Sequence, residues 1–275
     1  MGNNQDKILE RLFRYSAANG DVAQLDLLLQ RGVNPNAQDK NGYSALHFSS
    51  LAGHTDVVQL LTRHGANPNI KDRFGKTPSH FAVLANHPET LSALAQGGAD
   101  MNIGDLKGFR PIHTATRRQN ASLIKLLSHQ GADLACKDTY GQTAMHWGAF
   151  YGNEQVINAL IMCNSPIDPT NNNGQTPLAY AVLANNFKAT KLLLMAGADE
   201  THKNNQGLSP IQYVQRKKNG KLCTFFEKIL AERDSKNQHN SNLNQRLNHS
   251  GQKITHQNVN KNHLTFHQFK SIIKV

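Results

Sequence analysis

A glycine recurs every 33 residues through most of this chain, and this period limits the folds that the chain can adopt. It stands in the fragments DKNGYSALH, DRFGKTPSH, DLKGFRPIH, DTYGQTAMH, NNNGQTPLA and NNQGLSPIQ, as Gly42, Gly75, Gly108, Gly141, Gly174 and Gly207. No insertion interrupts the spacing, and residues 15–37 align in the same register with residues 48–70. A unit of 33 residues cannot bury its own apolar face, so we expect seven similar units to stack on one another.

Each unit carries the signals for two helices. The Asp/Asn-x-x-Gly start predicts a tight turn, because glycine adopts the positive φ that such a turn needs. A Thr-Pro pair such as Thr77-Pro78 then predicts a helix start, in which the hydroxyl residue is the cap and proline is the first helical residue. A Gly or Asn ends this helix, a second apolar-periodic helix follows, and Gly-Ala-Asp or Gly-Ala-Asn closes the unit. The fifth unit lacks this closure, and we expect Pro166 to break its second helix.

The order of turn, helix, short loop and helix within each interval resembles the ankyrin repeat, including its T-P-L-H-x-A signature. The resemblance covers about 230 of the 275 residues. It implies an all-α ankyrin-repeat solenoid of about seven helix–turn–helix units with short β-turn or hairpin tips. The expected organisation is an N-terminal capping unit at 1–38, five repeats over 39–203, a C-terminal capping unit at 204–236 and a tail at 237–275.

The composition changes in the tail. Residues 237–275 are rich in Asn, Gln and His, have no period, and hold five Lys or Arg residues but no Asp or Glu. Such a segment buries too little apolar surface to offset the entropy of ordering, so we expect it to be disordered. The final stretch LTFHQFKSIIKV regains some hydrophobicity, which fits either a frayed end or a short recognition or transport signal. Outside the tail the charge is only mildly basic, with 25 Lys or Arg against 19 Asp or Glu.

No sequence motif indicates an enzyme, a cofactor or a metal site. The chain has no phosphate-binding loop, HExxH helix, nucleophile elbow or dinucleotide fingerprint. Its three cysteines are widely separated without zinc-ligand spacing, which favours buried thiols in a reducing compartment. There is no apolar run long enough to cross a membrane and no apolar core of a signal peptide at the start. We therefore expect a non-enzymatic protein without a cofactor, a small-molecule substrate or a membrane segment.

Two columns of side chains that suggest chemistry are better explained by repetition. The first column holds His47, His80, His113 and His146, which stand one repeat apart and are therefore too distant to share a metal ion. In the ankyrin family this histidine organises the turns by hydrogen bonds. The second column is almost entirely aromatic and predicts packing between neighbouring first helices, with a ligand cage as the alternative; its members are Tyr15, Phe48, Phe81, Thr114, Trp147, Tyr180 and Tyr213.

The ankyrin resemblance implies where a partner binds. In that family the turn tips and the outward face of the first helix line a concave groove whose residues are not constrained by the fold. The units in the middle of the chain place aromatic residues beside Arg and Lys there, a mixture that is enriched in interface hot spots. The predicted partner-binding residues are Tyr43, Arg73, Phe74, Lys76, Lys107, Phe109, Arg117, Arg118, Tyr140, Phe150 and Tyr151.

These residues predict a protein-interaction module. We expect a monomeric scaffold or adaptor whose partner protein has acidic and apolar features. The chain also resembles the stand-alone ankyrin proteins of intracellular bacteria, some of which are delivered into host cells with a C-terminal signal. That resemblance implies a cytoplasmic or host-delivered effector, with the nucleus left open. The alternative is a regulatory subunit that meets nucleic acid or chromatin through its basic tail, although the mildly basic body disfavours nucleic acid.

Overall fold

A computed structural model describes residues 4–216 and 223–235 of the chain. The chain divides into two compact units between Ala144 and Met145, and each unit is described by itself. The predicted tail at 237–275 lies outside the described residues. Within them, no helix has both the length and the apolar character that are needed to cross a membrane.

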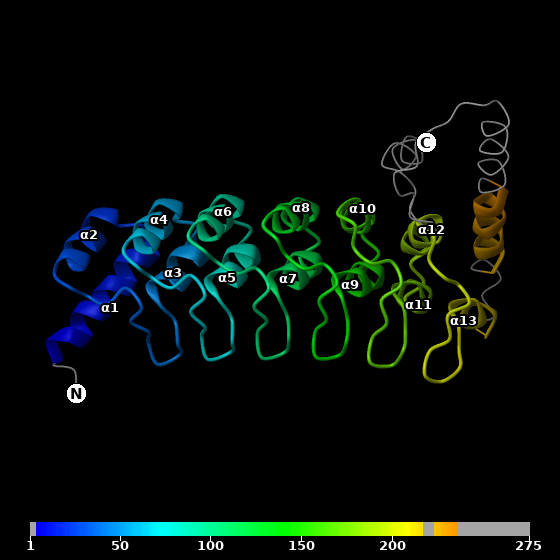
Figure 1. The fold of residues 1–275 in the computed structure, drawn as a ribbon, viewed down its shortest axis with the longest axis horizontal. Coiled ribbons are helices and arrows are strands. Elements are labelled where there is room, and N and C mark those ends of the chain that lie inside the picture. Colours follow the sequence, from blue (N-terminus) through cyan, green and yellow to red (C-terminus); the bar gives the residue numbers. More distant parts are fainter. Residues whose placement is uncertain (1–3, 217–222, 236–275) are drawn as a thin grey trace, which may run out of the picture. The chain divides into compact units, whose positions relative to one another are not determined.

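The first unit is built from helix pairs, as the repeat pattern predicts. First helices lie in one row, second helices in another, and the turn tips project from the row of first helices (Figure 1). The first helices are α1 (Asn4–Asn19), α3 (Ala45–Ala52), α5 (Pro78–Ala85) and α7 (Pro111–Arg117). The second helices are α2 (Val22–Gln30), α4 (Thr55–Arg63), α6 (Pro88–Gln96) and α8 (Ala121–His129). The predicted all-α fold is confirmed.

The acidic residue that opens each tip holds the turn with its side chain. The Asp72 carboxylate accepts hydrogen bonds from the backbone N–H groups of Phe74 and Lys76, both at 2.8 Å. Neighbouring tips are joined through their backbones, because the Arg73 N–H donates to the Asn41 carbonyl oxygen at 2.9 Å. The tips therefore recur with the period of the sequence because one carboxylate satisfies several turn donors in each of them.

The histidine column organises the tips by hydrogen bonds, which confirms the structural interpretation. The buried His80 ring accepts from the Thr77 N–H through Nδ1 at 3.1 Å. Because Nδ1 is an acceptor, the ring hydrogen is on Nε2, which donates to the Phe109 carbonyl oxygen of the next tip at 2.8 Å. His47 and His113 make equivalent bonds within the same unit.

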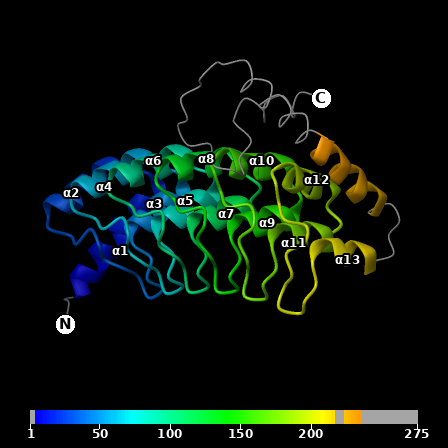
Figure 2. The ribbon, with the colours of Figure 1, turned by 45° about the vertical axis from the view of Figure 1, so that its right-hand side comes forward.

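In its described residues the second unit repeats this plan, and one further helix follows the repeats. Its helices are α9 (Ala144–Tyr151, whose first residue precedes the boundary), α10 (Glu154–Met162), α11 (Pro177–Leu183), α12 (Phe187–Met195), α13 (Pro210–Arg216) and a helix at 223–235. That final helix lies beside α12 (Figure 2), where the Phe225 and Phe187 rings meet edge to face at 5.1 Å. Arg233 forms a two-pronged ion pair with Glu200, with N–O distances of 2.8 and 2.9 Å. This helix covers apolar surface, since its Phe226 is buried.

In the second unit the helix end near Pro166 differs from the prediction, and two tips make a further side-chain hydrogen bond. Helix α10 ends at Met162. Shortly after this end, Asn164 takes the left-handed conformation (φ 60°) that glycine has in other units. The helix therefore stops before Pro166 is reached. The tip residues Asn171 and Asn204 each donate to a tyrosine hydroxyl of the aromatic column, at 3.0 and 2.8 Å.

The aromatic column is only partly a packing column. Phe48 and Phe81 are half-buried, and each meets the Tyr43 ring edge to face at 5.8 and 5.7 Å. Tyr15 on α1 is 67 % exposed, so it does not fit the prediction. Tyr15 lies within the 16-residue helix α1, and no described residue meets its ring as Tyr43 meets the rings of Phe48 and Phe81.

Replacing Gly53 by Ala is expected to destabilise the first unit more than replacing Gly65 by Ala. Both glycines have a positive φ, 82° and 80°, so each replacement carries the left-handed penalty of about 1–2 kcal/mol. At Gly53 an added Cβ would also lie 2.7 Å from the His87 ring, whereas nothing lies within 4 Å of it at Gly65. Urea unfolding followed by circular dichroism measures both free energies of unfolding. Equal losses would show that His87 moves aside without cost.

Candidate functional site

A column of exposed side chains recurs at one repeat position of the first helices. In the first unit it contains Leu51 (44 % exposed), Leu84 (37 % exposed) and the exposed Arg117. In the second unit it contains Phe150 and Leu183, both exposed. We call these five residues the inner column. Four of the five side chains are apolar and exposed, which makes the column a candidate binding surface.

The inner column of the first unit lies on the same side as the turn tips. A small hollow of about 30 Å³ is lined by Lys76 of one tip together with His80, Phe81, Leu84 and Thr114. The hollow lies where Thr114 takes the place that aromatic residues have in neighbouring units. This surface therefore combines apolar walls with a lysine at its edge.

The predicted tip residues of the first unit are mostly accessible. Arg73, Phe74, Lys107 and Tyr140 are exposed, and Lys76 is half-buried. The Arg73 guanidinium lies over the Phe74 ring at 4.9 Å from its centre and donates to the Asn41 side chain at 3.1 Å. Cation and ring are thus held together as one contact surface.

Two predicted contact residues are part of the scaffold. Phe109 is only 6 % exposed and meets the His113 ring at 5.6 Å. The Arg117 guanidinium lies over the Phe109 ring, 5.0 Å from its centre, so Phe109 positions Arg117 instead of presenting its own ring. Tyr43 is half-buried between the rings of Phe48 and Phe81, where it supports the tip.

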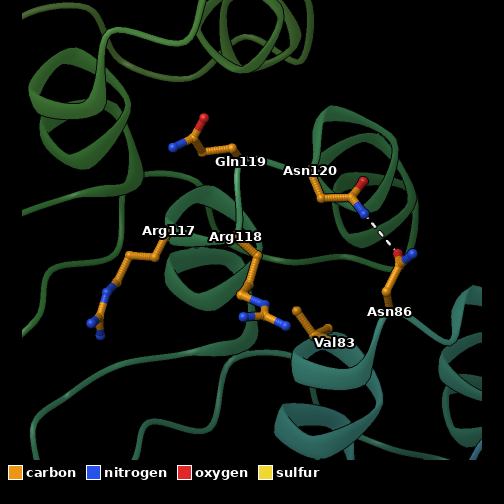
Figure 3. A pocket seen from close by; sticks show the side chains of 6 residues that line it. All are labelled: Val83, Asn86, Arg117, Arg118, Gln119 and Asn120. Carbon is orange, nitrogen blue, oxygen red and sulfur yellow. Dashed lines mark hydrogen bonds between the residues drawn. The ribbon is translucent and has the colours of Figure 1, made fainter.

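Arg118 lies apart from the inner column although it is adjacent to Arg117 in sequence. Arg117 and Arg118 point in different directions, and Arg118 is directed towards the end of α5 (Figure 3). It lines a polar cleft with Asn86, Asn120 and three other residues. Sequence spacing could not separate these two arginines, because the helix α7 ends between them.

In the second unit the predicted pair Phe150 and Tyr151 forms a cluster with Trp147. The Trp147 and Tyr151 rings are stacked with 6.1 Å between their centres, and the Phe150 and Tyr151 rings meet edge to face at 5.5 Å. Phe150 and Tyr151 remain exposed while Trp147 is half-buried. The rings fill the space between one another, so they present an apolar surface and no open cage.

One Cys–His pair invites a catalytic interpretation, which its environment disfavours. The Cys136 sulfur lies 3.9 Å from His113 Nδ1, but this nitrogen already accepts from the Arg110 N–H at 3.1 Å. Burial raises the pKa of the Cys136 thiol to about 11, so the reactive thiolate is scarce near neutral pH. Among the residues that the structure describes, no group of three His, Cys, Asp or Glu side chains is placed to hold a metal ion.

Sequence inspection missed Leu51 and Leu183 as surface residues. Both stand at the same repeat position as Leu84, Arg117 and Phe150, so the period itself was the available signal. Leucine at a helical position usually indicates a buried core residue, and only the exposed fraction distinguishes these from the core leucines beside them.

These paired helices and linked tips define a helical repeat protein that offers a surface for binding. The chain belongs to the ankyrin repeat family, because the family model for ankyrin repeats (3 copies) matches residues 13–105 and 112–204. Among solved structures it is similar to the ankyrin repeat domain of Bcl-3, described as a unique member of the IkappaB protein family. The two share 20 % identity and a TM-score of 0.73, and the match covers 78 % of this chain and 97 % of the other. No match to this chain was found among curated proteins. Ankyrin repeats are generally protein–protein interaction modules, and the fold is typically a non-enzymatic scaffold.

Proposed function

We propose that this protein is an adaptor that binds a partner protein on the tip-facing side of the first helices in the first unit. The observation that carries the proposal is the exposure of Leu51 and Leu84 on a face that also holds Lys76 and Arg117. Buried apolar contacts supply most of the affinity of such a surface, and the cations select an oppositely charged partner. The matching partner is an extended segment with apolar and acidic side chains.

A charge-reversal variant of this face tests the proposal. Arg73→Glu/Arg117→Glu is expected to weaken binding of the partner at least tenfold, because both guanidiniums are exposed and would then repel its carboxylates. The control Arg63→Glu/Lys125→Glu makes the same change in net charge on the second helices α4 and α8, where both side chains are also exposed. Affinity capture followed by mass spectrometry identifies the partner with wild-type protein, and titration calorimetry then measures each variant. Equal affinities for all three proteins would sink the proposal.

A charge-neutral variant tests the same face independently. Thr114→Phe places an aromatic ring where Phe48, Phe81 and Tyr180 already stand in other repeats, so we expect it to fold. The added ring fills the hollow beside Leu84 and Lys76. We expect it to lower the affinity for a partner whose side chain enters that hollow, and an unchanged affinity would place the contact elsewhere on the face.

We also propose that the basic tail is an address that directs the protein to its place of action, as in effectors delivered into a host cell. The five Lys or Arg residues without an acidic residue, and the apolar-basic stretch at 264–275, support this role. Deleting residues 237–275 is expected to abolish delivery and to leave partner binding unchanged. If the deletion instead weakens binding and removes its salt dependence, the tail is the electrostatic contact of a nucleic-acid-associated subunit.

A further inference from the structure

A polar cleft of about 440 Å³ lies in the first unit between the loop that joins α5 to α6 and the loop that joins α7 to α8. Its lining residues are Val83, Asn86, Arg117, Arg118, Gln119 and Asn120 (Figure 3). No Asp or Glu lines it. The cleft is therefore rich in hydrogen-bond donors and contains no negative side chain.

The cleft exists because the repeat pattern changes at this junction. One repeat earlier, the His87 ring spans the same place and its Nε2 lies 3.2 Å from the Leu51 carbonyl oxygen. That arrangement needs glycine at position 53, since a Cβ there would lie 2.7 Å from the ring. At this junction Asn86 stands at the glycine position and the shorter Asn120 stands at the histidine position. The imidazole is thus absent, and two carboxamides border the space.

With the two carboxamides in their observed orientation, the Asn86 amino group remains available to the cleft as a hydrogen-bond donor. The Asn120 side-chain oxygen caps helix α8 by accepting from the Leu123 N–H at 3.0 Å. Its Nδ2 must then be the group that donates to Asn86 Oδ1, at 2.7 Å. Both carboxamide oxygens are occupied, and no described residue accepts from the Asn86 amino group.

The guanidinium of Arg118 is available to this space. Arg118 is exposed, and among the residues that the structure describes none forms an ion pair or a hydrogen bond with its guanidinium. Arg117 contributes to the wall of the cleft, but its guanidinium lies over Phe109. One planar guanidinium with neighbouring amide donors matches one carboxylate in both shape and charge. A phosphate monoester, with a charge of about −1.5 to −2, would be only partly neutralised.

We propose that this cleft binds a carboxylate group, with Arg118 as its ion-pair partner and the Asn86 amino group as a second donor. The carboxylate is carried either by a small acid or by an acidic side chain of a protein. The cleft shares Arg117 with the inner column, but the proposed carboxylate contacts are Arg118 and Asn86, so the proposal does not depend on the proposed function.

A titration of the full-length protein followed by ¹⁵N nuclear magnetic resonance tests the site. The probes are glutarate, N-acetylglutamate methylamide and inorganic phosphate, each at constant ionic strength with chloride as the reference. We expect saturable shifts of the Arg118 Nε–H and the Asn86 side-chain amide signals with both carboxylates. Tighter binding of glutarate would indicate a small acid as the natural ligand, and tighter binding of the glutamate derivative would indicate a protein side chain.

Two variants and a control make the test specific. Arg118→Gln is expected to weaken carboxylate binding at least tenfold, and Asn86→Gly, which suits the left-handed φ of 64°, is expected to weaken it severalfold. The control Arg63→Gln removes an exposed arginine that lines no part of the cleft and should leave binding unchanged. Non-saturating shifts, equal binding by Arg118→Gln, or phosphate binding as tight as glutarate binding would each overturn the proposal. Unchanged backbone signals outside the cleft verify that the variants are folded.

Discussion

The free energy of unfolding of the first unit is expected to fall steeply as the pH drops below 6.5. The cause is the histidine column, in which burial lowers the pKa of His47, His80 and His113 below the ordinary value of 6.5. Each ring already accepts a backbone N–H at Nδ1, so a proton added there would place two donors face to face. These rings are therefore neutral in the folded protein and become protonated more readily when it unfolds.

The sign of the effect follows from proton linkage. Because the pKa of each histidine is lower in the folded state, the contribution of the neutral ring to the free energy of unfolding is fully present above pH 6.5. This contribution is lost as the pH falls from 6.5 towards the pKa of the histidine in the folded state. Each histidine contributes a slope of up to about 1.4 kcal/mol per pH unit, so three together reach about 4 kcal/mol per pH unit. The Arg233 guanidinium lowers the pKa of Glu200 below 4.5, so that ion pair is lost only in a more acidic range.

Urea unfolding between pH 8 and pH 5 measures this dependence. Far-ultraviolet circular dichroism follows the whole chain, and hydrogen exchange read out by mass spectrometry follows the first unit. His80→Gln should reduce the slope by about one third, because one of the three lowered groups is removed. His129→Gln, at an exposed position on α8, is the control. A free energy of unfolding that is constant from pH 8 to pH 5 would contradict the prediction.

The second large effect is expected from His80→Ala, which should destabilise the first unit by about 3 kcal/mol. The replacement leaves the buried Thr77 N–H without its partner and removes one of two hydrogen bonds to the Phe109 carbonyl oxygen, which still accepts from the Asp105 N–H at 2.9 Å. It also leaves a cavity, because the His80 side chain is buried.

A natural replacement in the last repeat supplies the matched variant. Gln212 stands at the histidine position, and its Oε1 accepts from the Ser209 N–H at 3.0 Å, as Nδ1 does in the histidine repeats. His80→Gln should therefore keep one of the two backbone bonds and lose about half as much stability as His80→Ala. Urea unfolding at pH 8 compares the two variants with wild type. Equal losses would mean that the bond to the Phe109 carbonyl oxygen carries the whole effect.

The sequence predicted the local structure of the repeats well because each repeat is held by short-range interactions. The helix starts at Pro78 and Pro111 and the turns at Asp72 and Asp105 depend on residues within a few positions of one another. Phase-locked repetition then indicated which residues are equivalent. It correctly predicted that His80 and its counterparts organise the turns by hydrogen bonds.

The candidate site was predicted less completely, because exposure depends on neighbouring repeats. Phe109 is an aromatic residue of the kind that is enriched at contact surfaces, but Arg117 and His113 cover it. Leu51 is an aliphatic residue of the kind usually found in a core, but its side chain is exposed to solvent. The burial of Phe109 depends on side chains outside its own turn, so no local pattern could reveal it. The exposure of Leu51, in contrast, is indicated by the repeat position that it shares with Leu84 and Arg117.

The sequence by itself determined the family, the length of each repeat and most of the places where helices start and stop, since these depend on the period and on residues close together in the chain. Only the tertiary structure decided which side chains meet across repeats. It placed Arg118 in a cleft between two loops, and it left Asn86 with an unused donor. The physical reason is that hydrogen bonding and burial at a junction depend on pairs of residues about one repeat apart, and each pair adjusts to the size of both partners.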